Sequence, residues 1–188
     1  RPHEKRSFRG VFSFPKADFV LRWLNMRPKK SLGQNFLHST AAREAMIRAA
    51  GLGSARGGGL ASAPPSTKVL EIGPGKGFLT EALLETGVKV VAVEKDDELF
   101  DFLQKKFAEN IQSGQLELIH GDILELIKGE ALGSLRSRLK NYQLVANIPY
   151  NLTGEIIRVF LSNPPGGKQP IMMVLMLQKE VAERIVGL

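Results

Sequence analysis

Cysteine is absent from the 188 residues of this sequence, which excludes a disulfide-bonded scaffold, a cysteine nucleophile and zinc bound by thiolates. The absence also fits a reducing compartment. Only three histidines occur, and His3, His38 and His120 lie too far apart for a metal-ligand spacing, so we expect no metal. No apolar run reaches the roughly 18 residues that a membrane-spanning helix needs, so we expect no membrane partner.

Negative charge is scarce near the N-terminus. The chain has 26 Lys and Arg against 19 Asp and Glu, a formal charge of +7. Residues 1–30 hold nine of the basic residues and only two acids, and the remaining residues carry 17 of each sign. A basic segment of this kind favours a polyanion through phosphate contacts. It could equally be a solvated arm without a partner.

The N-terminal extension, residues 1–26, is aromatic as well as basic and contains Phe8, Phe12, Phe14, Phe19 and Trp23. Residues 17–26 place apolar side chains at helical spacing, which indicates one amphipathic helix. The extension could be an organelle-targeting segment, because it is basic and poor in acids. It could also be translated sequence upstream of a start at Met26. The sequence leaves these readings open.

Two irregular stretches flank the first expected helix of the main domain. Residues 27–37 are basic and then turn-like, and the helix that follows is capped by Ser39 or Thr40. Residues 53–66 are rich in Gly, Ala, Ser and Pro, which predicts a loop inserted between two ordered elements.

From residue 68 the sequence alternates between short apolar strands and amphipathic helices. The expected strands are residues 68–72, 89–93, 116–119, 143–146 and 171–176, and the expected helices are residues 78–86, 96–109, 153–161 and 179–186. Such alternation predicts an α/β fold whose mostly parallel sheet is covered by helices on both faces. Right-handed crossovers then make it a doubly wound, Rossmann-like sheet.

Polar residues follow the expected strands where ligands bind in such sheets, at the carboxyl ends. The first strand leads into Glu71-Ile-Gly-Pro-Gly-Lys-Gly77, whose glycines at alternate positions depart from the dinucleotide spacing G-x-G-x-x-G. Gly73 and Gly75 would let the backbone approach a ligand closely. The alternative is a tight turn without a ligand.

Two carboxylates end the next two strands and complete the pattern of a nucleoside-bearing cofactor. Glu94 can accept hydrogen bonds from both ribose hydroxyls, and Asp122 can accept one from an adenine amine. The structural alternatives are a surface acid for Glu94 and an Asx turn for Asp122.

The tetrapeptide Asn147-Ile148-Pro149-Tyr150 follows the fourth strand and is suited to a planar base with an exocyclic amine. The Asn147 side-chain oxygen and the Ile148 carbonyl would accept from that amine. Tyr150 would stack on the ring, worth roughly 1–3 kcal/mol per base in nucleic-acid systems. A turn after a strand is the alternative, because Asn and Pro both favour turns.

Taken together, these residues resemble the ribosomal RNA adenine N6-dimethyltransferases of the KsgA type. The resemblance covers about residues 27–188 and rests on motifs in the family's order: SLGQNFL at 31–37, EIGPGKG at 71–77, Glu94, Gly121 with Asp122, NIPY at 147–150, and QKEVA at 178–182. The superfamily uses S-adenosylmethionine on a class I methyltransferase fold. The superfamily also includes the erythromycin-resistance RNA methylases. The SLGQNFL segment and the proline in the glycine loop look more like the small-subunit dimethylases than like these resistance methylases.

The resemblance implies roles for matching positions. Asn35 and Leu37 would line the methionine end of the cofactor, with Gln34 beside them in the site. Gly73, Glu71 and Gly75 would belong to the cofactor loop, with Glu94 at the ribose and Asp122 at the adenine. The catalytic group would be Asn147, Ile148, Pro149 and Tyr150. The implied reaction dimethylates N6 of adjacent adenosines near the 3′ end of small-subunit ribosomal RNA, during ribosome biogenesis.

Against the family's pattern, we expect this chain to lack the last two strands of the sheet and a C-terminal helical RNA-binding domain. We therefore expect most of the cofactor site to be encoded and full catalytic competence to be missing. A cytoplasmic monomer is expected, with organelle targeting as the alternative.

Three other functions are weighed against this reading. They are a resistance-type methylase of large-subunit RNA, an NAD-dependent Rossmann oxidoreductase, and an RNA-binding assembly protein that keeps the fold without catalysis.

Overall fold

The computed structural model describes residues 11–13, 20–23, 39–53, 68–127, 139, 141–148, 152–162, 169–177 and 179–186. The strands in these residues are β1 (Val11–Ser13), β2 (Val20–Trp23), β3 (Lys68–Ile72), β4 (Lys89–Glu94), β5 (Leu116–His120), β6 (Tyr142–Asn147) and β7 (Met172–Met176). The helices are α1 (Thr40–Ala49), α2 (Phe78–Glu85), α3 (Asp97–Lys106), α4 (Ala108–Gln112), α5 (Ile123–Leu126), α7 (Thr153–Ser162) and α8 (Lys179–Val186). Within this part of the chain, no helix is long and apolar enough to cross a membrane.

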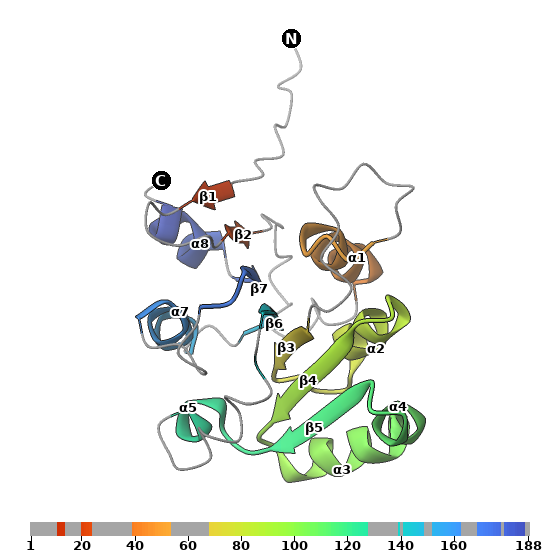
Figure 1. Ribbon diagram of the computed structural model, residues 1–188. Helices are drawn as coiled ribbons and strands as arrows, with labels where there is room; N and C mark the ends of the chain where they lie inside the picture. The colour runs from red at the N-terminus through yellow and green to blue at the C-terminus, as the bar shows by residue number, and fades with distance from the viewer. Residues whose placement is uncertain are drawn as a thin grey trace.

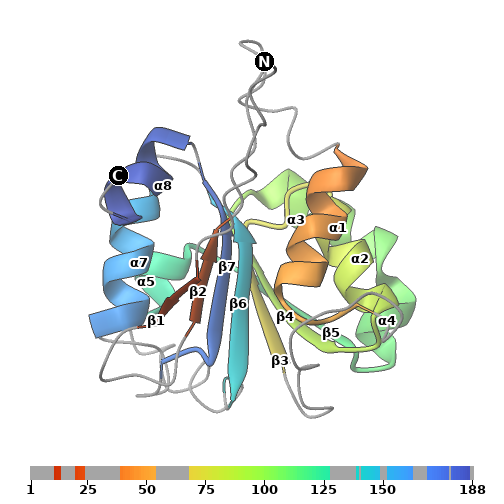
Figure 2. The ribbon, with the colours of Figure 1, turned by 90° about the horizontal axis from the view of Figure 1, so that it is seen from above.

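The strands form one sheet in the order β1-β2-β7-β6-β3-β4-β5 (Figure 1). The five strands from β3 to β7 are parallel to their neighbours. Helices α1 to α4 cover one face, and α5, α7 and α8 cover the other (Figure 2). The chain moves outward from β3 through β4 to β5, and then returns to the other side of β3 to form β6 and β7. This reversal confirms the predicted doubly wound α/β sheet and places its topological switch point between β3 and β6.

The prediction of a helix over residues 17–26 is wrong, because Val20–Trp23 form strand β2. Its backbone pairs in parallel with β7, from Val20 opposite Met172 to Trp23 opposite Leu175, and β1 adds antiparallel beyond it. An open sheet edge presents a row of unpaired N–H and C=O groups, and pairing them outweighs the local helical spacing. The edge of β7 is therefore occupied by a segment from the N-terminal extension.

One helix that the sequence predicts is divided into two helices in the structure. Residues 96–109 were predicted as a single helix, but α3 ends at Lys106 and α4 starts at Ala108, with Phe107 between them at φ −112° and ψ 28°. The non-helical backbone at Phe107 lets its ring stay buried while the chain turns toward β5. Elsewhere Ser39 caps α1 as predicted, by accepting a hydrogen bond from the Ala42 N–H. The expected loop at 53–66 lies, apart from Gly53, outside the described residues.

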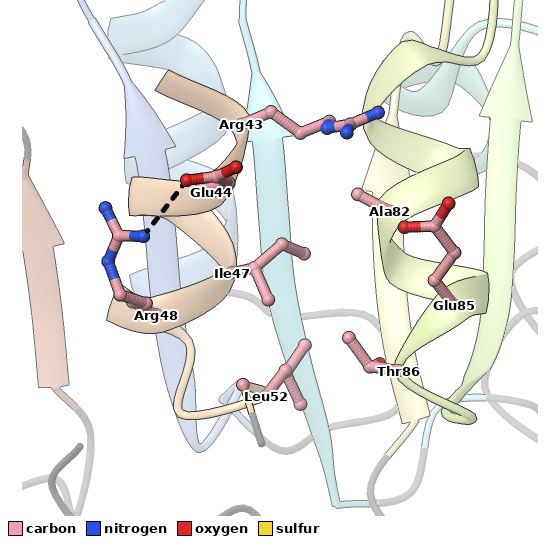
Figure 3. Close-up of a pocket in the computed structure, with 9 residues that line it drawn as sticks. Arg43, Glu44, Ile47, Arg48, Leu52, Ala82, Glu85 and Thr86 are labelled. Atoms are coloured by element: carbon pink, nitrogen blue, oxygen red, sulfur yellow. Dashed lines mark hydrogen bonds and ion pairs between the residues drawn. The ribbon is translucent and has the colours of Figure 1, made fainter. Parts of the chain in front are cut away.

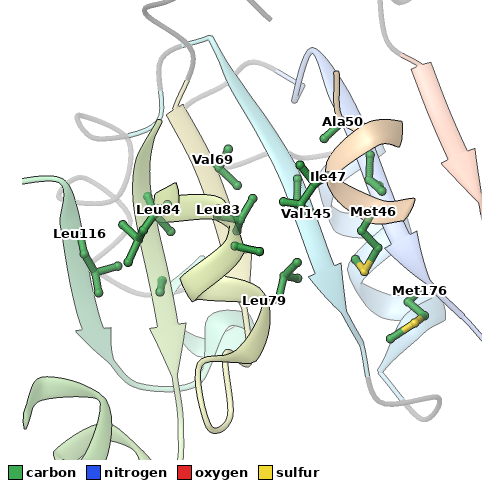
Figure 4. Close-up of a cluster of buried hydrophobic side chains, with 14 of the residues drawn as sticks. Met46, Ile47, Ala50, Val69, Leu79, Leu83, Leu84, Leu116, Val145 and Met176 are labelled. Carbon is green, nitrogen blue, oxygen red and sulfur yellow. The ribbon is translucent and has the colours of Figure 1, made fainter. Parts of the chain in front are cut away.

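Buried side chains alternate along the strands between two cores, as the pleat of a sheet requires. In β3, Leu70 and Ile72 join the core beneath α5 and α7, whereas Val69 joins the core beneath α1 and α2. Figure 4 shows the second core, where side chains of α1 and α2 meet those of the central strands. Because β3 is buried on both faces, its polar residue Glu71 is buried as well, at 1% exposure.

The glycine loop after β3 is braced by the end of α3. Gly77 has φ +76°, and a Cβ atom there would lie 2.4 Å from Phe107 Cε2 and 2.9 Å from Leu103 Cδ2. From the same helix, Lys106 Nζ donates to the Lys76 carbonyl over 3.3 Å. The loop is thus held between β3 and α3 through a contact that only glycine permits at its last position.

We predict that Gly77→Ala destabilises the chain by about 3 kcal/mol. Roughly 1–2 kcal/mol comes from the left-handed backbone and a similar amount from the clash with Phe107. Gly87→Ala is the matched control, because Gly87 has φ +82° but no atom of the described residues lies within 4 Å of the added Cβ. The expected effect of this control is the backbone contribution alone, roughly 1–2 kcal/mol. Urea unfolding measures both, and equal effects would contradict the bracing contact.

Candidate functional site

The carboxyl ends of β3, β4 and β5 lie side by side at one edge of the sheet. The Gly73 N–H donates to the Val93 carbonyl over 2.9 Å, and the Gly121 N–H donates to the Glu94 carbonyl over 2.9 Å. These backbone bonds continue the strand register past the last residues of the strands. The sequence-predicted residues Glu71, Glu94 and Asp122 are thereby carried on adjacent strand ends.

Open space lies above the first two glycines of the loop. Gly73 and Gly75 have φ of +65° and +60°, and no atom of the described residues lies within 4 Å of a Cβ built on either. The positive φ accounts for glycine at both positions. Because none of the described residues fills this space, the described part of the loop leaves room for a ligand to approach its backbone.

Glu94 connects this loop to the end of β4 through hydrogen bonds of its carboxylate. Its carboxylate is buried, at 6% exposure. Oε2 accepts from the Gly75 N–H over 2.9 Å, and Oε1 accepts from the N–H groups of Lys95 and Asp96 over 2.9 and 3.0 Å. A carboxylate has about four lone-pair directions, so three backbone donors leave capacity for one more donor.

Asp122 caps the N-terminus of α5 and accepts a hydrogen bond on each carboxylate oxygen. Oδ1 accepts from the Leu124 N–H over 2.8 Å, and Oδ2 accepts from Lys95 Nζ over 2.9 Å. The hydrogen bond from Lys95 is the largest influence on the pKa of Asp122 and holds it below its usual range, while burial acts in the opposite direction. The same contact raises the pKa of Lys95. Asp122 is therefore an anion at neutral pH, paired with a cation that sequence reasoning missed.

Glu71 differs from the other two carboxyls because it faces α2 inside the second core. Burial raises its pKa from 4.5 to about 8, the charge of Glu94 adds to the rise, and Thr80 opposes it. Its Oε2 has no hydrogen-bond partner among the described residues. A buried, neutral carboxyl with a vacant acceptor beside an open glycine loop fits a site that a polar ligand completes.

Asn147 and Ile148 lie across the switch point from the glycine loop. Asn147 ends β6, is half-buried and pairs with Met176 of β7, and Ile148 is buried at 5% exposure. β6 pairs with β3 over Lys68–Leu70. The other predicted site residues, Gln34, Asn35, Leu37, Pro149 and Tyr150, lie outside the described residues, so their roles remain predictions.

A separate hollow of about 580 Å³ lies between α1 and α2 (Figure 3). Its lining combines charged and apolar side chains and includes Arg43, Arg48, Glu85 and Ile47. Arg48 forms an ion pair with Glu44 over 3.4 Å. None of the predicted site residues that the structure describes contributes to it. The hollow is thus distinct from the strand-end site.

Comparison with known proteins gives a consistent family. A family model described as "Ribosomal RNA adenine dimethylase" matches residues 25–188. The ribosomal RNA small subunit methyltransferase A of Synechococcus sp. (strain JA-3-3Ab) is 43% identical over 166 residues, covering 84% of this chain and 50% of the relative. The protein of the same name from Dehalococcoides mccartyi is 38% identical over 172 residues, covering 92% of this chain and 52% of the relative. The chain spans about half the length of these curated relatives.

Solved structures agree on the fold. The 23S rRNA methyltransferase ErmE matches with a TM-score of 0.59 at 23% identity, covering 81% of this chain and 52% of that one. A dimethyladenosine transferase from Plasmodium falciparum matches with a TM-score of 0.52 at 26% identity, covering 79% of this chain and 45% of that one. The predicted class I methyltransferase fold is thereby confirmed.

Glu71→Gln is expected to remove a pH-dependent contribution to stability. Because the pKa of Glu71 is raised to about 8 in the folded chain, the folded state keeps a proton that the unfolded state releases above about pH 4.5. The free energy of unfolding of the wild-type chain therefore falls as the pH rises from about 5 to about 8. The neutral glutamine has the same shape and makes no such contribution.

Denaturant unfolding at several pH values across that range measures the difference between the two chains. Glu85→Gln, at an exposed position on α2, should follow the wild type. Parallel pH curves for wild type and Glu71→Gln would show that Glu71 is ionised in the folded chain.

Proposed function

The chain belongs to the ribosomal RNA adenine dimethylase family, and from this premise we propose that it methylates N6 of adenosines in small-subunit ribosomal RNA, with S-adenosylmethionine as the methyl donor. The observation that supports this most is the meeting of the glycine loop, Glu94 and Asp122 at one edge of the sheet, with Asn147 across the switch point. Ligands bind at this place in doubly wound sheets. The assembling small ribosomal subunit is the proposed partner.

The described residues suit both parts of the nucleoside of such a cofactor, its ribose and its adenine. Glu94 would accept from a ribose hydroxyl with its remaining lone pair, and Asp122 would accept from the adenine amine. Open space over Gly73 and Gly75 would admit the chain that joins the ribose to the methionine group. By the family resemblance, Gln34, Asn35 and Leu37 would hold the methionine end.

The protein's chemical task is to make a poor nucleophile react. The lone pair of an adenine amine is conjugated with the ring, and bound S-adenosylmethionine supplies a methyl group activated by its sulfonium. The side-chain oxygen of Asn147 and the carbonyl of Ile148 would accept hydrogen bonds from the amine, which favours a more tetrahedral nitrogen. Holding this nitrogen in line with the methyl group supplies much of the remaining acceleration.

The target base must leave its stack before it can reach Asn147. Extrusion requires a few kcal/mol, and stacking on Tyr150 would offset part of that requirement. The amine releases one proton for each methyl group that it gains. A strong base is not required, because the methylated amine is acidic enough to lose its proton to water.

Two observations weigh on the alternatives. The curated relatives at 38–43% identity are named for the small subunit, whereas the likeness to the large-subunit enzyme ErmE lies at 23% identity and shows the fold alone. Small-subunit RNA is therefore the favoured substrate. An NAD-dependent oxidoreductase is disfavoured by the G-x-G-x-G spacing of the loop.

Calorimetric titration tests the cofactor assignment. The wild-type chain should bind S-adenosylmethionine and not NAD, and Glu94→Gln should weaken binding about tenfold or more, because an ionic acceptor is lost. Glu85→Gln is the matched control and should bind like wild type. Thermal unfolding shows whether each variant is folded. Binding of NAD alone would move the protein to the oxidoreductases.

Methyl transfer to isolated ribosomal subunits tests the catalytic assignment. With labelled S-adenosylmethionine, the chain should label small subunits that lack the modification in preference to large subunits. Asn147→Ala should lower the rate about a hundredfold or more while cofactor affinity changes little, because Asn147 acts on the amine. Unchanged methylation in Asn147→Ala would refute its catalytic role, and a preference for large subunits would favour a resistance-type methylase.

A further inference from the structure

Lys95 stands directly after the ribose-binding candidate Glu94 and reaches across to the next strand end. Its ammonium donates to Asp122 Oδ2 over 2.9 Å. Its backbone N–H, by contrast, is fixed on Glu94 Oε1. The residue therefore spans the interval between the two carboxylates that the proposed function assigns to ribose and adenine.

The ion pair uses the acceptor that adenine would need. Asp122 Oδ1 is already bonded to the Leu124 N–H at the start of α5. Oδ2 is then the oxygen best placed to accept from an arriving amine, and Lys95 Nζ already uses one of its two lone-pair directions. Asp122 is only 19% exposed, which limits the directions from which a second donor can approach.

The pair is easily reversed, because its cation is in water. The Lys95 side chain is 74% exposed, and ion pairs with such exposure contribute little net stability. Lys95 can leave Asp122 without burying or stranding its charge. Glu125 is the other carboxylate whose charge acts on Lys95, and it is exposed as well.

We propose that Lys95 is a latch on the adenine subsite, competing with the exocyclic amine for Asp122 and so setting the affinity and the purine preference of the cofactor. This inference rests on the proposed function. Ligand binding exchanges one hydrogen bond to Asp122 for another, so the aspartate is never left without a donor. The exchange lowers the net gain from recognising the amine.

The latch predicts an effect confined to ligands that carry the amine. Lys95→Met keeps an unbranched apolar side chain and removes the ammonium. It should bind S-adenosylhomocysteine about two- to fivefold more tightly than wild type, the range expected for releasing one exposed ion pair. The affinity for S-inosylhomocysteine, which has a carbonyl in place of the amine, should not increase. S-adenosylhomocysteine has no net charge, so simple repulsion between cations does not produce the effect.

Two controls separate the latch from charge and from folding. Lys89→Met removes the same charge at the opposite end of β4, where Lys89 is exposed, and should leave both affinities unchanged. Lys95→Arg keeps a cation beside Asp122 and should not show the tighter binding of S-adenosylhomocysteine that is expected of Lys95→Met. Calorimetry with the 188-residue chain gives all the affinities.

The outcomes distinguish the latch from the function on which it rests. If the wild-type chain binds neither ligand, the proposed cofactor site is refuted. It is also refuted if Glu94→Gln binds each ligand with the same affinity as the wild-type chain. If the wild type binds S-adenosylhomocysteine as expected but Lys95→Met binds it equally or more weakly, the latch alone is refuted. Equal tightening for both ligands would also refute it, because the amine would then play no part.

Discussion

The carboxylate of Glu94 accepts three backbone hydrogen bonds, and the remainder of the site depends on them. One bond reaches forward to Gly75 in the loop after β3, and two return to the turn that starts α3. A buried carboxylate requires such donors, because an unpaired charge in the interior is strongly disfavoured. The requirement fixes the glycine loop, the end of β4 and the start of α3 relative to one another.

The surrounding packing makes that arrangement rigid. Phe107 and Leu103 contact Gly77 from the side of α3, so the loop cannot shift away from the sheet without opening the second core. Strands β3 and β4, which carry the glycine loop and Glu94, are buried on both faces, and this burial fixes their register. Strand-end carboxylates therefore project from a packed base, and Glu71 is drawn into the core where burial keeps it protonated.

The alternation of strands and helices, and the polar residues at the strand ends, were predictable because both follow from local periodicity and from a general rule about parallel sheets. The strand at Val20–Trp23 was not, since its pairing with β7 depends on an edge more than a hundred residues away in the chain. The break at Phe107 also depends on tertiary burial. Lys95 was missed because its position in the sequence, directly after a strand-end carboxylate, does not show that its ammonium reaches Asp122.

A crystal structure of the chain with S-adenosylhomocysteine is the most direct test of this account. We expect the ligand to lie across the ends of β3, β4 and β5, with a ribose hydroxyl on Glu94, the adenine amine on Asp122, and the Gly75 N–H still bonded to Glu94. A ligand seated in the hollow between α1 and α2, or one that leaves Glu94 without contact, would contradict it.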